Sequence, residues 1–92
     1  MTKKEEFYLL LKMYNNGEYE TNVFCNEVLR ILFYESNGIS EFTGKERESV
    51  EELANVVERY SPYKSDHEKF PNIYYTEKNV KVAVEKFYEQ LK

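Results

Sequence analysis

The stretch that decides the fold runs from Thr21 to Tyr34 and reads T-N-V-F-C-N-E-V-L-R-I-L-F-Y. On a helix of about 3.6 residues per turn, its apolar residues cover roughly half of the circumference. They are Phe24, Cys25, Val28, Leu29, Ile31 and Leu32. A helix with one neighbour needs an apolar stripe of only about 100°. The stretch therefore predicts the central helix of a small bundle, with these residues buried and with Phe33 and Tyr34 on its polar side.

Other helices are predicted on either side of this stretch by apolar residues that recur every three or four positions. The core-facing residues that we expect are Phe7, Leu10, Leu11, Tyr14, Val50, Leu53, Ala54, Val57, Val80, Val84, Phe87, Tyr88 and Leu91. With the central helix, the four predicted helices lie near residues 2–16, 21–36, 43–60 and 76–91.

Short polar patterns mark the ends of these helices. T-K-K-E at Thr2 and T-G-K-E at Thr43 both have the form of a capping box. Thr21 and Thr76 are predicted to cap the other two helices. N-N-G and S-N-G follow the first two helices, and their glycines are predicted to adopt the left-handed conformation that ends a helix.

Residues 62–75 show no helical periodicity and contain two prolines and four Tyr or Phe residues. We interpret them as an ordered loop, held by its rings rather than flexible. Tyr60 and Tyr75 are interpreted as pinning this loop to the helices. The predicted fold is all-α, a small antiparallel four-helix bundle with an ordered aromatic loop before the last helix, and residues 1–92 make one domain.

Composition indicates a globular protein of a reducing compartment, with 41% hydrophobic and 33% charged residues. Cys25 is the only cysteine, and we interpret it as a small buried hydrophobic residue. The N-terminal residues are too charged for a signal peptide, and no apolar run approaches the roughly 20 residues that a membrane span needs. We therefore expect a cytoplasmic protein.

The negative charge is confined to one part of the chain. Residues 41–68 hold eight acids and four bases, and the rest of the chain is neutral, with nine of each. Nucleic acids and anionic lipids both require a basic surface, so neither is an expected partner. A basic protein is the partner that this distribution favours.

The residues for catalysis or metal binding are few. With one histidine and one cysteine, a His/Cys metal cluster cannot form. Ser65, Asp66 and His67 have the residue types of a catalytic triad, but sequence adjacency does not give triad geometry. We interpret His67 as a solvated loop residue and expect neither an enzyme nor a cofactor.

The predicted third helix carries a group of outward carboxylates, namely Glu48, Glu51, Glu52 and Glu58, within an arc of about 120°. Glu58 lies at the wrong end of the helix dipole, and like charges three and four positions apart repel each other. These acids either form a binding surface or are an ordinary solvated face with Arg59 among them. The sequence leaves both interpretations open.

The order of parts resembles a known family. F-C-N-E-V in the central helix, E-R-Y-S-P-Y at the end of the acidic helix and K-F-P-N-I-Y-Y-T-E before the last helix carry the likeness, which spans nearly the whole chain. The chain is similar to the bacterial immunity proteins of the colicin D type, the self-protective colicin-like immunity proteins. The resemblance implies a helical bundle that binds the nuclease domain of a cognate toxin that cleaves tRNA. It further implies that acidic side chains fill the basic cleft that would hold the RNA.

By type and placement, the toxin-binding residues that the resemblance implies are Glu48, Glu51, Glu52 and Glu58, and we add Tyr63, Asp66 and Glu68 from the following loop. Tyr63 serves equally well as an anchor for the loop. Two alternatives stay open. One is a helical adaptor unrelated to toxins, and the other is an immunity protein that binds a toxin away from its active site. We expect a monomer, and a dimer remains possible.

Overall fold

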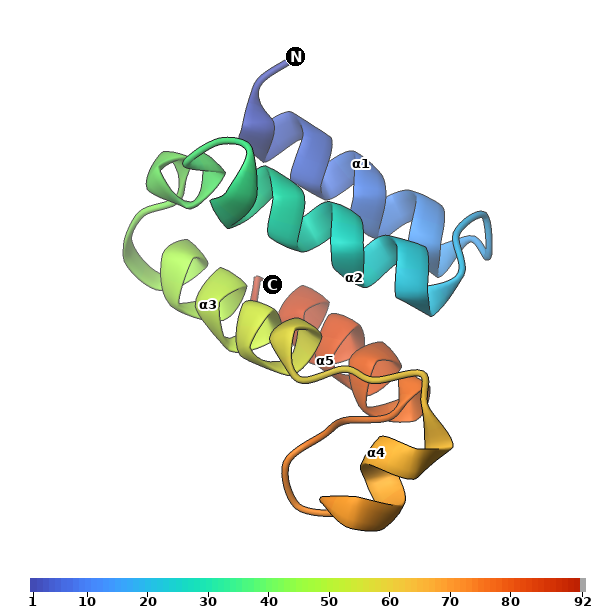
Figure 1. The fold of residues 1–92 in the computed structure, drawn as a ribbon. Coiled ribbons are helices and arrows are strands. Elements are labelled where there is room, and N and C mark those ends of the chain that lie inside the picture. Colours follow the sequence, from blue (N-terminus) through green and yellow to red (C-terminus); the bar gives the residue numbers. More distant parts are fainter. Residues whose placement is uncertain (92) are drawn as a thin grey trace.

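The computed structural model describes residues 1–91, and within that range every regular element is helical (Figure 1). The elements in chain order are α1 (Lys3–Asn15), α2 (Thr21–Leu29), the π-helix η1 (Arg30–Tyr34), the 3₁₀-helix η2 (Gly38–Glu41), α3 (Gly44–Glu58), α4 (Lys64–Lys69) and α5 (Glu77–Gln90). Tyr60 and Tyr75 form an isolated parallel bridge. The prediction of an all-α protein is confirmed.

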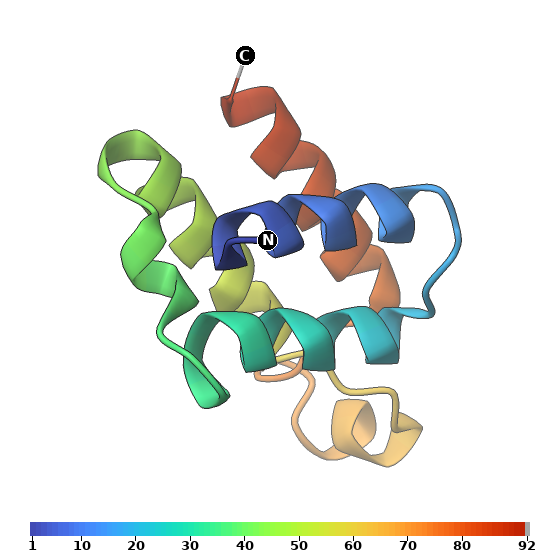
Figure 2. The same ribbon diagram turned by 90° about the horizontal axis from the view of Figure 1, so that it is seen from above.

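The four long helices form two antiparallel pairs. α1 lies beside α2, and α3 lies beside α5, which is its main packing partner. Seen from above, the α3–α5 pair crosses the α1–α2 pair instead of running along it (Figure 2). The aligned antiparallel bundle of the sequence prediction is thus not confirmed.

Aromatic rings fill the centre of the core. The ring of Phe7 meets that of Phe42 at 5.3 Å and that of Phe87 at 5.7 Å between centroids, in edge-on geometry. Tyr14 stacks on Phe24 at 4.2 Å. The predicted core residues of α1, α3 and α5 are buried, except that Tyr88 is half-buried and Leu91 is 40% exposed.

The central helix departs from its prediction at both ends. Thr21 is its first helical residue and not its cap, because its hydroxyl is bonded to the Tyr14 hydroxyl at 2.8 Å. At the other end the α-helix stops at Leu29 and continues as one π-helical turn. Leu29 is only half-buried, whereas the other five residues predicted as its apolar face are fully buried.

Two glycines act in different ways. Gly17 follows α1 with φ +79°, the left-handed conformation that the sequence predicts. Gly38 does not have a positive φ, so its predicted role was wrong. It is needed for space instead, because a Cβ there would lie 2.4 Å from the carbonyl oxygen of Ile31.

Of the four predicted threonine caps, which include Thr21, two are confirmed. Thr2 forms a full capping box with Glu5, and Thr76 forms one with Asn79. Thr43 makes no side-chain bond to α3. The carboxylate of Glu46, which would accept from the Thr43 N–H in a full capping box, is instead bound by Lys4 and Tyr8 of α1.

Residues 62–74 form a lobe that projects from the helices beyond the Tyr60–Tyr75 bridge (Figure 1). The prediction of an ordered segment without helix was wrong in one respect, since the lobe contains α4. None of the residues of α4 is buried. A helix without a buried face leaves no apolar periodicity in the sequence, which explains why it was missed.

Candidate protein-binding face

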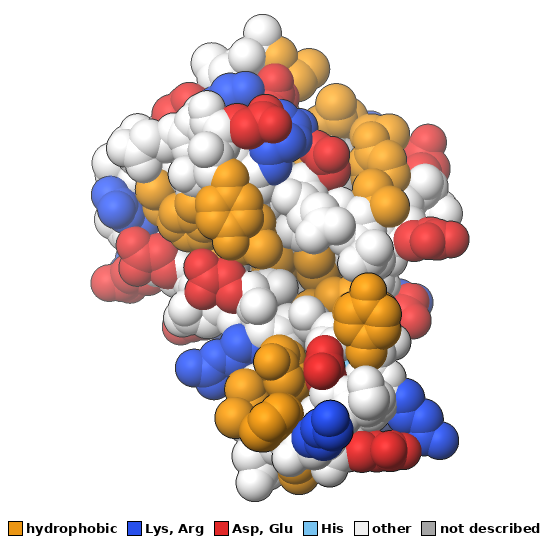
Figure 3. Space-filling view, in the orientation of Figure 1, with side chains coloured by type: hydrophobic (Ala, Val, Ile, Leu, Met, Phe, Trp, Pro, Cys, Tyr) orange, Lys and Arg blue, Asp and Glu red, His pale blue; other side chains and the backbone are white. Residues whose placement is uncertain are grey.

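Helix α3 presents its predicted acids to solvent. Glu48, Glu51, Glu52 and Glu58 are all exposed, while the opposite face of α3 lies in the core. Figure 3 shows acidic side chains gathered over α3, with hydrophobic side chains exposed between α2 and α3. We refer to these four glutamates as the acidic face.

Two members of the acidic face have cationic partners. Arg47 lies 2.9 Å from Glu51, one turn away on the same helix. Lys86 of α5 lies 3.8 Å from Glu52, whose carboxylate also accepts a hydrogen bond from Gln90. Within residues 1–91, Glu48 and Glu58 form no ion pair. These two therefore carry the unneutralised charge of the face.

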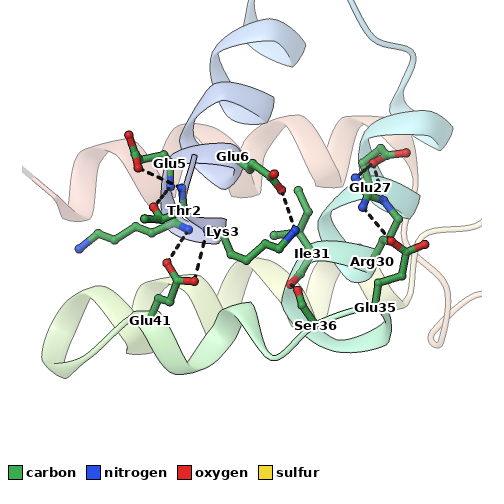
Figure 4. Close-up of polar contacts among 11 residues, drawn as sticks. Thr2, Lys3, Glu5, Glu6, Glu27, Arg30, Ile31, Glu35, Ser36 and Glu41 are labelled. Carbon is green, nitrogen blue, oxygen red and sulfur yellow. Dashed lines mark hydrogen bonds and ion pairs between the residues drawn. The ribbon is translucent and has the colours of Figure 1, made fainter.

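Other acids of the same stretch have structural roles. Glu41 accepts hydrogen bonds from the backbone N–H groups of Lys3 and Lys4, at 3.3 and 3.0 Å (Figure 4). A carboxylate at this place satisfies donors that are otherwise unpaired and stabilises the positive end of α1. No local sequence pattern predicts this contact, because the partners are 37 and 38 residues apart.

Glu46 is the second structural acid. Its carboxylate accepts from Lys4 Nζ at 2.8 Å and from the Tyr8 hydroxyl at 2.6 Å. The hydrogen bond from Lys4, and to a smaller extent that from Tyr8, lowers the pKa of Glu46. Burial of Tyr8, followed by its bond to Glu46, raises the pKa of the Tyr8 hydroxyl. The arrangement ties the beginning of α3 to α1.

The lobe contributes the remaining predicted residues in different ways. Tyr63 is 66% exposed and is free for contact. Glu68 is exposed, with Lys64 Nζ at 3.9 Å. Asp66 is half-buried and accepts a hydrogen bond of 2.6 Å from Ser61 Oγ, so its carboxylate helps to hold the lobe.

An acidic hollow lies at the base of the lobe, and the sequence analysis did not find it. Its volume is about 500 Å³, and it is lined by Glu20, Thr21, Asn22, Tyr60, Pro62 and Glu77. These residues come from the beginnings of α2 and α5 and from the end of α3. Only the tertiary packing brings them together, which is why no motif revealed them.

Within residues 1–91, the few residue types of metal and catalytic sites lie apart or have other partners. No group of three or more His, Cys, Asp or Glu residues is placed to hold a metal ion there. Asp66 and His67 each bond to Ser61 and not to one another, so no triad is formed. His67 is half-buried with Nε2 at 2.8 Å from the Ser61 carbonyl, which corrects its interpretation as a solvated residue. Burial raises the pKa of the Cys25 thiol to about 12, which confirms an inert core residue.

Comparisons with protein-family models, with curated proteins and with solved structures give no match for this chain. None of the helices in residues 1–91 has the combination of length and apolar character that crossing a membrane requires.

Proposed function

We propose that this chain is an immunity protein that neutralises a bacterial toxin nuclease by placing its acidic face over the basic substrate cleft of the toxin. One observation carries the proposal. Glu48 in the second turn of α3 and Glu58 at its last residue stand outward without a cationic partner in residues 1–91. Glu48 also lies three and four positions from Glu51 and Glu52, and like charges at that spacing lower the stability of a helix slightly, so a partner that neutralises them accounts for their placement.

The mechanism is occlusion, with one inhibitor bound to each toxin. A nuclease needs cations in its cleft to hold phosphate groups. Carboxylates at the surface of a helix attract the same cations, and their long-range field speeds the encounter of the two proteins. Nothing is turned over, so the proposal requires no catalytic residue or cofactor of this chain.

The resemblance to colicin D-type immunity proteins supplies the specific form of the proposal. On this basis the toxin is a tRNase, and the inhibitor acts in the cytoplasm as a monomer. The fold expected of such a protein is an antiparallel helical bundle. The two antiparallel pairs, α1–α2 and α3–α5, supply the helices for it.

The neighbouring reading frame gives the first test. The proposal expects a large toxin with a basic C-terminal domain immediately upstream, and its absence would count against a toxin partner. The second test uses that domain and a charge reversal, Glu48→Lys with Glu58→Lys. This pair is preferred to Glu51 and Glu52, whose ion pairs with Arg47 and Lys86 would be lost as well.

Two cations facing a basic cleft should weaken binding by about a hundredfold or more, mainly through slower association, and protection of cells should fail. Unfolding free energy should change by less than about 0.5 kcal/mol, because both positions are exposed. The matched control is Glu85→Lys with Glu89→Lys on α5, where both residues are also exposed. Equal protection by the two double variants would show that the acidic face is only a solvated surface.

The exposed apolar residues favour a second candidate, a helical adaptor that docks through hydrophobic contacts. Phe33 is 40% exposed and Tyr34 is 74% exposed, and both lie in η1 at the end of α2. Affinity that hardly changes with ionic strength would favour the adaptor, because charge-driven binding weakens as salt screens it. An immunity protein that binds away from the active site would leave the toxin free to bind its RNA, which a competition assay detects.

A further inference from the structure

The lobe, residues 62–74, is attached to the helices through a single residue at its base. In the part of the chain that the structure describes, the hydrogen bonds that leave the lobe all go to Ser61. The Ser61 hydroxyl donates to Asp66 at 2.6 Å and accepts from the Tyr63 N–H at 3.2 Å. The Ser61 carbonyl accepts from His67 Nε2 at 2.8 Å. Opening the lobe therefore breaks only these bonds to the rest of the molecule.

The lobe also takes no part in the hydrophobic core. None of the residues of α4 is buried. Among residues 1–91, no side chain of the lobe belongs to the core or packs against it. A segment with few buried apolar contacts opens at a much lower free energy than the whole molecule. The lobe can therefore open while the Tyr60–Tyr75 bridge and the helices on either side stay in place.

The segment that can open carries two exposed lysines. Lys64 is the first residue of α4 and Lys69 is the last, and the side chain of Lys64 is 91% exposed. Figure 3 shows basic side chains on the surface of the lobe. The basic residues of α1, α3 and α5 lie in helices whose other faces are buried. Because a protease cuts a folded chain where it opens, cleavage in those helices requires loss of core packing.

We infer that the lobe is a site of limited proteolysis, where a protease that cuts after lysine divides the folded chain between α3 and α5. Exposed segments whose backbone has few tertiary contacts are the preferred sites of such cleavage. Each cut hydrolyses one peptide bond with one water molecule. The hydroxyl of the water goes to the carbonyl carbon of Lys64 or Lys69, and its hydrogen goes to the nitrogen of the next residue. The inference is independent of the proposed function, because it concerns the chain without a partner.

The cut chain should stay assembled. Val80, Val84 and Phe87 of α5 are buried, and α3 is the main packing partner of α5. These contacts involve no residue of the lobe, so cleavage leaves them intact. After cleavage, however, α5 is held without a covalent link, and its attachment depends on protein concentration. Cleavage of the lobe thus converts a permanent contact between α3 and α5 into one that dilution can break.

The test treats the full native chain with a small amount of trypsin and identifies the products over time by mass spectrometry. The first cuts within the helical part of the chain should fall after Lys64 or Lys69. The variant Lys64→Gln with Lys69→Gln should lose the intact chain about tenfold more slowly or less than that. The matched control is Lys45→Gln with Lys78→Gln, two exposed lysines in the first turns of α3 and α5. This control should be cut like the wild type.

First cuts within α1, α3 or α5, or equal loss of the wild type and the lobe variant, would overturn the inference. Circular dichroism of each variant checks that the helices are retained.

A second variant tests whether cleavage follows opening at Ser61. Ser61→Ala should be cut in the lobe about fivefold faster or more, because the open form becomes more populated. An unchanged rate would contradict opening at this residue. Size-exclusion chromatography then tests assembly: the cut wild-type chain should elute like the intact chain in native buffer, and its two pieces should separate in urea. Pieces that elute apart in native buffer would show that α5 does not stay bound.

Discussion

Phe7 in α1 and Phe70 in the lobe are the same residue type in opposite environments. Phe7 has no exposed surface and packs edge-on against Phe42 and Phe87. Phe70 is 47% exposed and has one aromatic neighbour, Tyr74, in its own lobe. The helices bury their rings against each other, whereas the lobe is held by hydrogen bonds and leaves its rings in solvent. The buried rings of the helices and the exposed rings of the lobe thus contribute very differently to the stability of this 92-residue chain.

The largest expected difference comes from truncating these two rings. Phe7→Ala should lower the free energy of unfolding by about 3–5 kcal/mol, because it removes buried surface and leaves a cavity among rings. Phe70→Ala should lower it by less than about 0.5 kcal/mol. Urea denaturation of both variants measures the two values. If both variants lose a similar free energy of unfolding, the lobe is part of the core and the contrast between the two regions is wrong.

The same contrast explains what the sequence could and could not predict. Helices with a buried face were found from their periodicity, and all of α1, α3 and α5 lie within the predicted ranges. α4 has no buried residue and left no pattern. Thr2 and Thr43 begin equivalent sequence patterns, yet only Thr2 forms the capping box. At Thr43, the Glu46 carboxylate that would accept from its backbone N–H is taken by Lys4 and Tyr8, which are remote in sequence.

For the candidate site, the exposure of the acids could be predicted from the sequence, but their ion pairs could not. Helical spacing was sufficient to predict that Glu48, Glu51, Glu52 and Glu58 are exposed. The charge count of residues 41–68 overstated the free negative charge. Lys4 and Lys86 belong to other parts of the chain, and the fold brings them to Glu46 and Glu52. Such pairings depend on how α1 and α5 pack against α3, which no local pattern records.

A smaller effect is expected from releasing the lobe. Ser61→Ala removes the hydroxyl that joins Asp66 to the Tyr63 N–H, and opening of the lobe should become easier by about 1–2 kcal/mol. Hydrogen exchange should show this as faster exchange of the Phe70 amide, which is bonded to the Asp66 carbonyl at 2.9 Å. Amides within α3 and α5 should change less.

Ser65→Ala serves as the control for this variant, because Ser65 is an exposed serine of α4 in the same lobe. It should leave the exchange rate of Phe70 nearly unchanged. An equal acceleration of lobe and core amides by Ser61→Ala would show that the two regions unfold as one cooperative unit. The lobe would then not open independently of the core.

The smallest effect concerns Glu46, an acid of the negatively charged stretch that joins α3 to α1 and is not part of the acidic face. Hydrogen bonds from Lys4 and then from Tyr8 lower its pKa below the usual value of 4.5. A carboxyl group with a lowered pKa in the folded state stabilises that state above the unfolded pKa, and the contribution is lost as pH falls through the folded pKa. At pH 7, Glu46→Gln should therefore be less stable than the wild type by up to about 1 kcal/mol, as for partly exposed ion pairs.

Denaturation at a series of pH values should show this difference shrinking as the pH drops below 4.5. Glu85→Gln, at an exposed position, should show no such trend. A constant difference at all pH values would mean that Glu46 acts through packing alone, and its separation from the acidic face would lose its electrostatic basis.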